Sequence, residues 1–506
     1  MTKRIFSILL AALFAVSAVL LPSCSESKTN ADEETAPPAA EPVTTPDAEI
    51  PEEPEEEAEI LPDIPELDFG GEDFTFLTSG PNDDNGSDWI TYDVWVEELN
   101  GEVINDAVFE RNSYLQDTYK FKFIEEKTNS TVHDTLKKDV KSGGSYDAAF
   151  TGIMRGQSLG ADGFTHRMSD VPYIDLTKPW WDHRATEDLT MLGAVYQGTG
   201  DISVIDNDAT WILMFNKQMR EDLQLEDIYD LVREDRWYYD TFYEMLKTAS
   251  RDADGNGKME WKVDTYGLVT TGNTCYGLLY ASGEKMAPKN EEGIPTLITS
   301  LDRMTAVVEK AGMILGDLDN VFVCDRTGTS PEDLRHVFEE GRGLFYGEVM
   351  QCVTRMRDSE TDFGVIPWPK FDEGQSKFYN FVHNTAAKSL VIPVSQNRLE
   401  MAGAIVEAMA AKSMYTLTKA YYDVAFTYKY MRDEESAEML DIILDSRSYD
   451  PAYINDFGGF AGNVYNVIYN GGANFASKWS SQSKVFTKTR DKMFNKLADL
   501  NAERGG

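Results

Sequence analysis

The chain has 506 residues and a formal net charge of −40 at pH 7. A surface this acidic argues against nucleic acid or anionic lipid as partners, because like charges repel. It does not restrict a neutral ligand. The length exceeds the size at which one hydrophobic core stops growing, so two lobes are expected.

The N-terminus is predicted to be a secretory signal. Two basic residues precede an apolar run over residues 5–21, and Leu21-Pro22-Ser23-Cys24 follows. A basic start, an apolar stretch and small residues before a cut site are typical of such signals. Leu-x-Ser-Cys resembles the lipobox of bacterial lipoproteins, which predicts a signal peptide over 1–23 and a lipid on Cys24. An uncleaved membrane anchor or a plain secretory signal is the alternative, since Pro22 departs from the usual small residue. Each interpretation places the remaining chain outside the cytoplasmic membrane.

An acidic, proline-rich segment follows Cys24. From Ser25 to Asp68 there are sixteen acidic residues, eight prolines and one lysine. Such a composition has little to bury and repels itself, so residues 24–69 are predicted to be a disordered, extended spacer. A solvated tail without a role is the alternative. So long a tether favours the outer face of a Gram-positive cell.

Beyond the spacer, strand and helix patterns alternate. Alternating or short apolar runs predict strands at 73–78, 119–124 and 146–150. Apolar residues at helical spacing predict helices at 103–119 and 132–140. This β-α-β-α-β order implies a mostly parallel sheet with helices on its faces.

The later part of the chain is predicted to contain further strands and helices. Helices are expected to begin at Asn216 and Leu225, and Ser330 is expected to cap the helix that Pro331 begins. The segment 363–369 contains two prolines and is therefore expected at a sheet edge. The other predicted strands are 209–215, 344–346 and 387–392, and the other predicted helices are 240–251, 301–313, 331–339, 399–411, 436–444 and 485–500.

Several segments, in order, carry a resemblance to a known family. They are Asn100 to Asn112, Pro172 to Asp182, Thr210 to Lys217, and the pair Glu340 to Glu348 with Asp362 to Lys370. Together they resemble the extracellular solute-binding proteins of ABC importers, in the branch that binds sugars and oligosaccharides. In that family such segments are the first helix, a tryptophan-rich turn, the first crossing between lobes, and the second crossing with its return.

The resemblance implies a fold, a division into lobes and a function. The fold is α/β and two-lobed, periplasmic-binding-protein-like, with mostly parallel sheets flanked by helices and a hinged cleft between them. Lobe one would hold 70–208 and 348–412, and lobe two 209–347 and 413–506. A small ligand, a carbohydrate, would bind in the cleft of a monomer, and the closed form would be presented to a membrane permease. No step needs a catalytic residue, so the protein is expected not to be an enzyme.

Aromatic and acidic residues near the expected cleft are the candidates for ligand binding. Flat aromatic faces stack on sugar rings, while carboxylates and amides bond to hydroxyl groups. For any single tryptophan, packing in the core is the alternative, and it is favoured for Trp211. The candidates are Trp180, Trp181, Asp182, Asp208, Trp211, Tyr276, Tyr346, Glu348, Trp368 and Trp479.

A loop with the spacing of a calcium site follows the helix predicted at 240–251. Its oxygen donors would be the side chains of Asp252, Asp254, Asn256 and Glu260 with the carbonyl of Lys258. Val263 stands where an EF-hand has its last glutamate, so that motif is incomplete. The loop resembles those of some sugar-binding proteins of this family, which a distant carboxylate completes, and a structural Ca²⁺ is expected. The alternative is a turn without an ion.

Two further points of chemistry stay open. Cys275, Cys324 and Cys352 are interpreted as buried free thiols, although one pair could form a bridge. The sequence has no nucleophile elbow, zinc-protease, Walker A or dinucleotide motif. An extracellular glycoside hydrolase, which needs two carboxylates, and a non-transport surface protein that binds carbohydrate remain the alternative functions.

Overall fold

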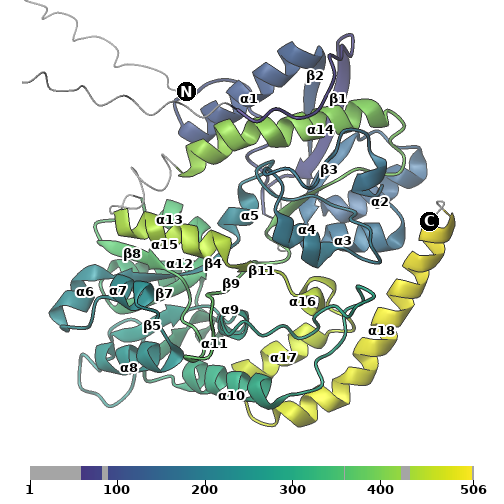
Figure 1. The fold of residues 1–506 in the computed structure, drawn as a ribbon. Helices are drawn as coiled ribbons and strands as arrows, with labels where there is room; N and C mark the ends of the chain where they lie inside the picture. Colours follow the sequence, from purple (N-terminus) through teal and green to yellow (C-terminus); the bar gives the residue numbers. More distant parts are fainter. Residues whose placement is uncertain (1–58, 82–88, 358, 423–433, 504–506) are drawn as a thin grey trace, which may run out of the picture. The chain divides into compact units, whose positions relative to one another are not determined.

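The computed structural model describes residues 59–81, 89–357, 359–422 and 434–503, and its elements form two main sheets with helices around them (Figure 1). The expected signal peptide, Cys24 and the spacer up to residue 58 lie outside the described residues. Among the described helices, none is both long and apolar enough to cross a membrane.

The first sheet is formed largely by the N-terminal part of the chain. Its strand order is β10-β3-β1-β2, with β1 parallel to both β2 and β3 and with β10 antiparallel to β3. The expected parallel β-α-β-α-β order is therefore confirmed. Its strands are β1 (Glu72–Ser79), β2 (Phe121–Thr128), β3 (Ala148–Gly152) and β10 (Lys388–Val391).

Side chains alternate along β1, so that neighbouring residues pack against helices on opposite faces of this sheet. Phe74 and Phe76 point to one face and pack with side chains of α1 and α14. Leu77 points to the other face and packs with α2 and α3. These helices are α1 (Val103–Tyr119), α2 (Val132–Ser142), α3 (Ile153–Asp162) and α14 (Leu399–Ser413).

The second sheet has the order β6-β5-β7-β4-β8. Strands β5, β6 and β7 are parallel, and β4 is antiparallel to both β7 and β8. Strand β8 lies at the edge, as two following prolines require, since neither can donate to a ladder. The strands are β4 (Trp211–Asn216), β5 (Tyr266–Thr270), β6 (Val321–Val323), β7 (Gly343–Val349) and β8 (Phe363–Ile366).

The remaining longer helices lie around the second sheet, except that α16 and α18 pack against α3 beside the first sheet. Helix α6 begins after its N-cap Asn216, close to the expected start, whereas the helix expected from Leu225 begins only at Ile228. As predicted, Ser330 caps α12 and Pro331 begins it, in a capping box. The helices are α6 (Lys217–Asp222), α7 (Ile228–Arg233), α8 (Tyr239–Ala249), α9 (Thr274–Ala281), α10 (Asp302–Gly316), α11 (Cys324–Thr327), α12 (Pro331–Glu339), α13 (Gln351–Arg355), α15 (Glu434–Asp445), α16 (Pro451–Asn455), α17 (Phe460–Tyr469) and α18 (Phe475–Glu503).

The remaining elements are short, and some of them lie where the chain passes between the sheets. Helix α5 precedes β4 in the first passage, and β9 pairs with β11 near the second. These elements are η2 (Met168–Asp170), α4 (His183–Leu189), α5 (Ile205–Asp208), β9 (Asn380–Phe381), the π-helical turn η3 (Met414–Thr418) and β11 (Arg447–Ser448).

The second passage lies later in the chain than the sequence suggested. We expected residues 348–412 to belong to lobe one, but β8 pairs with β4 inside the second sheet, so that part of the prediction is wrong. The return runs from Val382, which bridges to Thr210, to β10. The backbone N–H of His383 donates to the carbonyl of Ala209 at 3.0 Å, so the two passages lie side by side.

The expected spacer also ends earlier than residue 69. Ile64, Leu67 and Phe69 pack against the core of the first sheet, and the ring of Phe69 stacks on that of Tyr119. The backbone N–H of Ile60 donates to the hydroxyl of Tyr415 at 2.7 Å. Apolar residues interleaved with the acids therefore bind residues 59–69 to α1, α14 and η3 as an N-terminal strap.

A chain that begins at Gly70 should be less stable than one that begins at Glu59, because it lacks the strap. Losing these partly buried apolar side chains should lower the free energy of unfolding by about 3 kcal/mol. Thermal or denaturant unfolding of the two purified chains checks this. Equal midpoints would show that the strap contributes nothing to the fold.

Candidate functional site

A cavity of about 300 Å³ lies at the carboxyl edge of the second sheet. Strands β5, β6 and β7 are parallel, so their carboxyl ends meet there, and the antiparallel β4 begins at the same edge. Ligands of α/β proteins bind at this kind of edge. The residues lining this carboxyl-edge cavity include Trp89, Trp211, Thr271, Asn273, Asp325, Arg335, Tyr346, Glu348, Gln351, Cys352, Arg355 and His383.

The structure brings three of the predicted residues, Trp211, Tyr346 and Glu348, to this cavity. The side chains of Trp211 and Tyr346 are each only 1% exposed. Trp211 packs so closely on α9 that a Cβ at Gly277 would meet its ring at 2.7 Å. Both aromatics are therefore rigid walls of the cavity rather than free stacking surfaces, and core packing of Trp211 is confirmed.

Glu348 is the buried carboxyl group of this cavity. One of its oxygens accepts the backbone N–H of Val349 at 3.0 Å. The pKa of Glu348 is raised to about 7, chiefly by burial; the Val349 hydrogen bond and Arg355 lower it, and Asp325 adds a smaller increase. Near neutral pH this carboxyl group can therefore either donate or accept a hydrogen bond.

Trp89 is an aromatic residue of this cavity that the sequence did not single out. It follows β1 in the chain, is partly buried and packs against the core of the second sheet. Asn273, beside the start of α9, adds a partly exposed amide. The signal that could have identified Trp89 was its position just beyond the carboxyl end of the first strand.

A second cavity, of about 470 Å³, lies beside the carboxyl end of β3. It is lined by Met154 and Arg155 at the start of α3, by Asn455 of α16 and by Thr385. Thr385 is two residues from His383, which lines the carboxyl-edge cavity. The second passage of the chain therefore contributes to both cavities.

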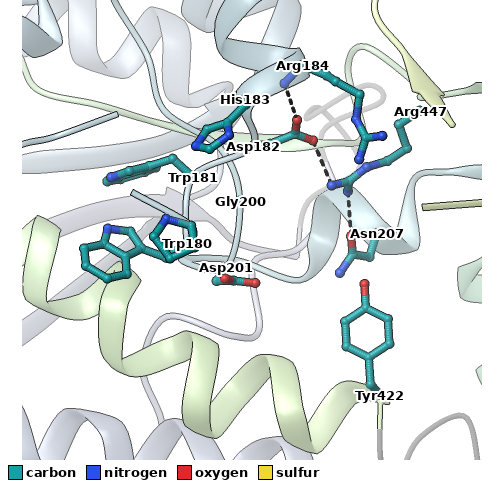
Figure 2. A pocket seen from close by; sticks show the side chains of 11 residues that line it. Trp180, Trp181, Asp182, His183, Arg184, Gly200, Asp201, Asn207, Tyr422 and Arg447 are labelled. Atoms are coloured by element: carbon teal, nitrogen blue, oxygen red, sulfur yellow. Dashed lines mark hydrogen bonds and ion pairs between the residues drawn. The ribbon is translucent and has the colours of Figure 1, made fainter. Parts of the chain in front are cut away.

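Trp180, Trp181 and Asp182 line a different pocket, of about 340 Å³ (Figure 2). The indole N–H groups of Trp180 and Trp181 donate to the two oxygens of Glu407 on α14, at 3.1 and 3.0 Å. Their rings are 0% and 2% exposed and point away from Arg447. They pack in the core, and the stacking role predicted for them has no exposed ring face here.

Asp182 belongs to the group of ion pairs and hydrogen bonds around Arg447. We call this pocket the Arg447 pocket. The Asp182 carboxylate caps α4 by accepting the backbone N–H groups of Arg184 and Ala185. Its other oxygen lies 2.8 Å from the Arg447 guanidinium, which also pairs with Asp206 at 3.3 Å. Burial opposes ionisation of Asp182, but Arg447 and these hydrogen bonds hold the pKa below its usual value.

The remaining predicted residues do not line the carboxyl-edge cavity as far as the described residues define it. Asp208 is buried and accepts the hydroxyl groups of Tyr92 and Tyr421, both at 2.7 Å. Burial raises its pKa to about 6. The others are core side chains, namely Tyr276, Trp368 and Trp479.

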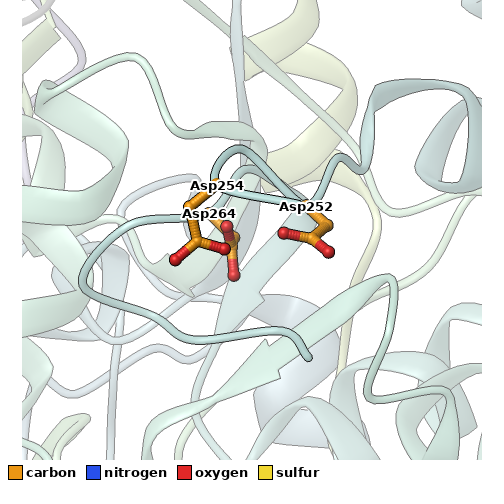
Figure 3. A group of neighbouring side chains, drawn as sticks. All are labelled: Asp252, Asp254 and Asp264. Atoms are coloured by element: carbon orange, nitrogen blue, oxygen red, sulfur yellow. The ribbon is translucent and has the colours of Figure 1, made fainter. Parts of the chain in front are cut away.

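The predicted calcium loop places three carboxylates together. Oxygens of Asp252, Asp254 and Asp264 lie within 4.8 Å of one another (Figure 3). Asp264, the residue after Val263, was not among the predicted ligands; it is buried and accepts the backbone N–H of Ala253. It closes the loop in the way a distant carboxylate would, and the oxygen-rich donor set fits a hard cation.

The other predicted ligands of the loop lie beside these three carboxylates. The side-chain amide of Asn256 donates to Asp254 at 3.0 Å and to Glu260 at 2.9 Å. The backbone N–H of Lys258 donates to the Asn256 oxygen at 2.8 Å. Hydrogen bonds thus order the loop with its carboxylates on one side.

The three cysteines of the described chain, Cys275, Cys324 and Cys352, are free and buried, as predicted. Cys352 also lines the carboxyl-edge cavity, where the Tyr346 hydroxyl lies 3.5 Å from its sulfur. Burial raises the pKa of the Cys324 thiol to about 12. Thiols kept protonated in this way are unreactive.

Sequence comparison finds neither a matching protein family nor a matching curated protein. Structure comparison finds the same fold in a cyclo/maltodextrin-binding protein complexed with maltotetraose (TM-score 0.53, 12% identity, 86% of this chain and 97% of that one). An ABC substrate-binding protein from Listeria monocytogenes in complex with cycloalternan is similar (0.52, 13%, 85% and 99%). So is an ABC transporter solute-binding protein from Thermotoga lettingae bound with α-D-tagatose (0.50, 14%, 84% and 100%). The chain therefore has the expected two-lobed α/β fold of periplasmic-binding proteins.

Substituting Glu348 by glutamine should stabilise the protein at high pH. The pKa of Glu348 rises from the usual 4.5 to about 7 on folding, so folding favours the protonated carboxyl group, and this advantage is lost as pH rises through that range. Glutamine mimics the protonated form. At pH 8 we expect the free energy of unfolding of Glu348→Gln to exceed that of the wild type by up to about 3 kcal/mol. Near pH 4 the two proteins should be equally stable.

Unfolding midpoints of both proteins across pH 4–8 check this sign. Glu309→Gln, an exposed glutamate of α10, is the matched control. A variant less stable than the wild type at pH 8 would mean that the ionised carboxylate is held by favourable partners.

Proposed function

We propose that this protein is the extracellular, lipid-anchored solute-binding component of an ABC importer and that it captures a carbohydrate without chemical change. The observation that carries the proposal is the carboxyl-edge cavity within a fold shared with proteins whose complexes contain maltotetraose, cycloalternan and tagatose. Those structural relatives are binding proteins, which supports binding rather than turnover.

The chemistry of the cavity suits a neutral, hydroxyl-rich ligand. Trp89 offers a partly exposed aromatic surface of the kind that packs against the apolar face of a sugar ring. Glu348, Asn273 and Gln351 provide acceptors and donors for hydroxyl groups. A few convergent polar groups on aromatic and apolar walls are typical of small-molecule sites.

Delivery would follow from hinge bending. The adjacent passages at Ala209 and His383 are the places where the two sheets could move relative to each other. A lipid on Cys24 and the acidic spacer would keep the protein near a permease and raise its local concentration. A calcium ion held by Asp252, Asp254 and Asp264 would stiffen the loop that follows α8 without contacting the ligand.

A glycoside hydrolase is the second candidate, because one cavity contains three carboxyl groups, those of Asp325, Glu332 and Glu348. The raised pKa of Glu348 is a property that a general acid needs. Incubation with glycans followed by product analysis separates the two functions. We expect no cleavage. Cleavage by the wild type that Glu348→Gln abolishes would show that the protein is a hydrolase and not only a binding protein.

Removing the Trp89 ring should weaken sugar binding. We expect Trp89→Ala to reduce the affinity for maltotetraose, cycloalternan or tagatose, whichever binds, about tenfold or more, since the stacking surface is lost. Titration calorimetry after a thermal-shift screen of sugars measures this. Trp95→Ala is the matched control, because Trp95 is 37% exposed and does not line the cavity. Equal losses in both variants would place the sugar elsewhere.

Calcium should raise the unfolding temperature. A ligand that binds only the folded state stabilises it by mass action, so excess Ca²⁺ should shift the midpoint upward and a chelator should reverse the shift. Asp254→Asn should remove the effect, whereas the exposed Asp319→Asn should not. A midpoint that calcium leaves unchanged would mean that the loop is an ion-free turn.

A further inference from the structure

Among the residues that the structure describes, the Arg447 pocket has one carboxylate without an ion-pair partner. Its lining contains two carboxylates, Asp182 and Asp201, and two guanidinium groups, Arg184 and Arg447. Arg447 pairs with Asp182 and with Asp206 behind the lining. Asp201 accepts the hydroxyl of Thr418 at 2.9 Å. Within the described part of the chain, no cation lies within ion-pair distance of Asp201. A partly buried carboxylate without a cationic partner is destabilised, so the side of the pocket at Asp201 favours a positively charged group.

The neighbouring Asn207 presents a donor to the same space. Its amide oxygen accepts from the Arg447 guanidinium at 2.6 Å, and a guanidinium can only donate. This fixes the amide orientation, so the nitrogen faces the pocket. Figure 2 shows that nitrogen and the Asp201 carboxylate turned toward one another across the pocket. A ligand that fills the gap must donate to Asp201 and accept from Asn207.

The pocket differs from the carboxyl-edge cavity in size, position and charge. Its volume of about 340 Å³ is at the small end for ligand sites. Its walls come from the loop around Trp180, from residues 200–207 and from Arg447, rather than from strand ends. The ring of Tyr422 forms part of the wall (Figure 2). Its hydroxyl group points toward Asn207 (Figure 2).

We propose that the Arg447 pocket binds a small 1,2-amino alcohol, the class to which 2-amino sugars belong. Its ammonium group bonds to Asp201, and its adjacent hydroxyl oxygen accepts the amide N–H of Asn207. The site is separate from the sugar cavity proposed above and does not depend on that function. Burial raises the pKa of Asp201 to about 7, and Asp206 and Asp182 raise it while Thr418 and Arg447 lower it. The bound cation would supply the missing counter-charge.

The test compares glucosamine with glucose, which differ in one group at carbon 2. Calorimetric titration of the full chain at pH 7.5 should show glucosamine binding about tenfold or more tightly than glucose, because only glucosamine forms the charge-assisted bond. Asp201→Asn should abolish that preference, since asparagine keeps the shape and the Thr418 bond but removes the charge. Asp445→Asn, which removes an exposed acid beside Arg184, should retain it.

Each outcome decides the proposal. Equal affinity for both sugars, or a glucosamine preference that survives Asp201→Asn, overturns it. The unfolding midpoint of Asp201→Asn without ligand shows whether that variant is folded. Trp89→Ala should leave glucosamine binding intact, so a failure of the proposed sugar cavity and a failure of this site give different results.

Discussion

The ion pair between Arg447 and the carboxylates of Asp182 and Asp206 holds together segments that are far apart in the chain. Asp182 begins α4, Asp206 belongs to α5 at the first passage, and Arg447 lies on β11, which pairs with β9 near the second passage. A buried guanidinium must have its charge matched by neighbouring acids. The terminal nitrogens of Arg447 bind Asp182, Asp206 and Asn207 in fixed directions, which favours one arrangement of the segments.

A second group of hydrogen bonds at the same passage positions the carboxyl-edge cavity. Asp208 accepts from Tyr92, and Asp93 accepts from the hydroxyl of Ser203 at 2.8 Å. Tyr92 and Asp93 belong to the segment that carries Trp89, which follows the first sheet but packs against the second core. The aromatic surface proposed for sugar binding is therefore held by polar contacts to the hinge, and a shift of the first passage would move it.

The sequence predicted those elements whose pattern is local. Helix α1 has the bounds 103–119 that were expected, because apolar side chains recur on one face. Helix α9 was missed because all eight residues are buried, so no polar face marks the helical period. The acidic residues around the strap likewise hid Ile64 and Phe69, which a composition count cannot distinguish from spacer. The assignment of β8 to lobe one failed for another reason. The partner of a strand is determined by contacts between residues far apart in the chain, which local patterns do not reveal.

Tryptophans illustrate why site residues are harder to predict than elements. Trp180 and Trp181 resembled a sugar platform, yet the buried Glu407 takes both indole N–H groups and keeps the rings in the core. Burial raises the pKa of Glu407 to about 7, as it does for Glu348 and Asp201. Buried carboxyl groups of this kind accept hydroxyl or ammonium donors and repel anions. The net charge of −40 also disfavours anions, and it does so over a longer range, because the electrostatic field of the surface repels them. The surface field and these buried carboxyl groups thus act in the same direction, favouring neutral and cationic molecules over anions.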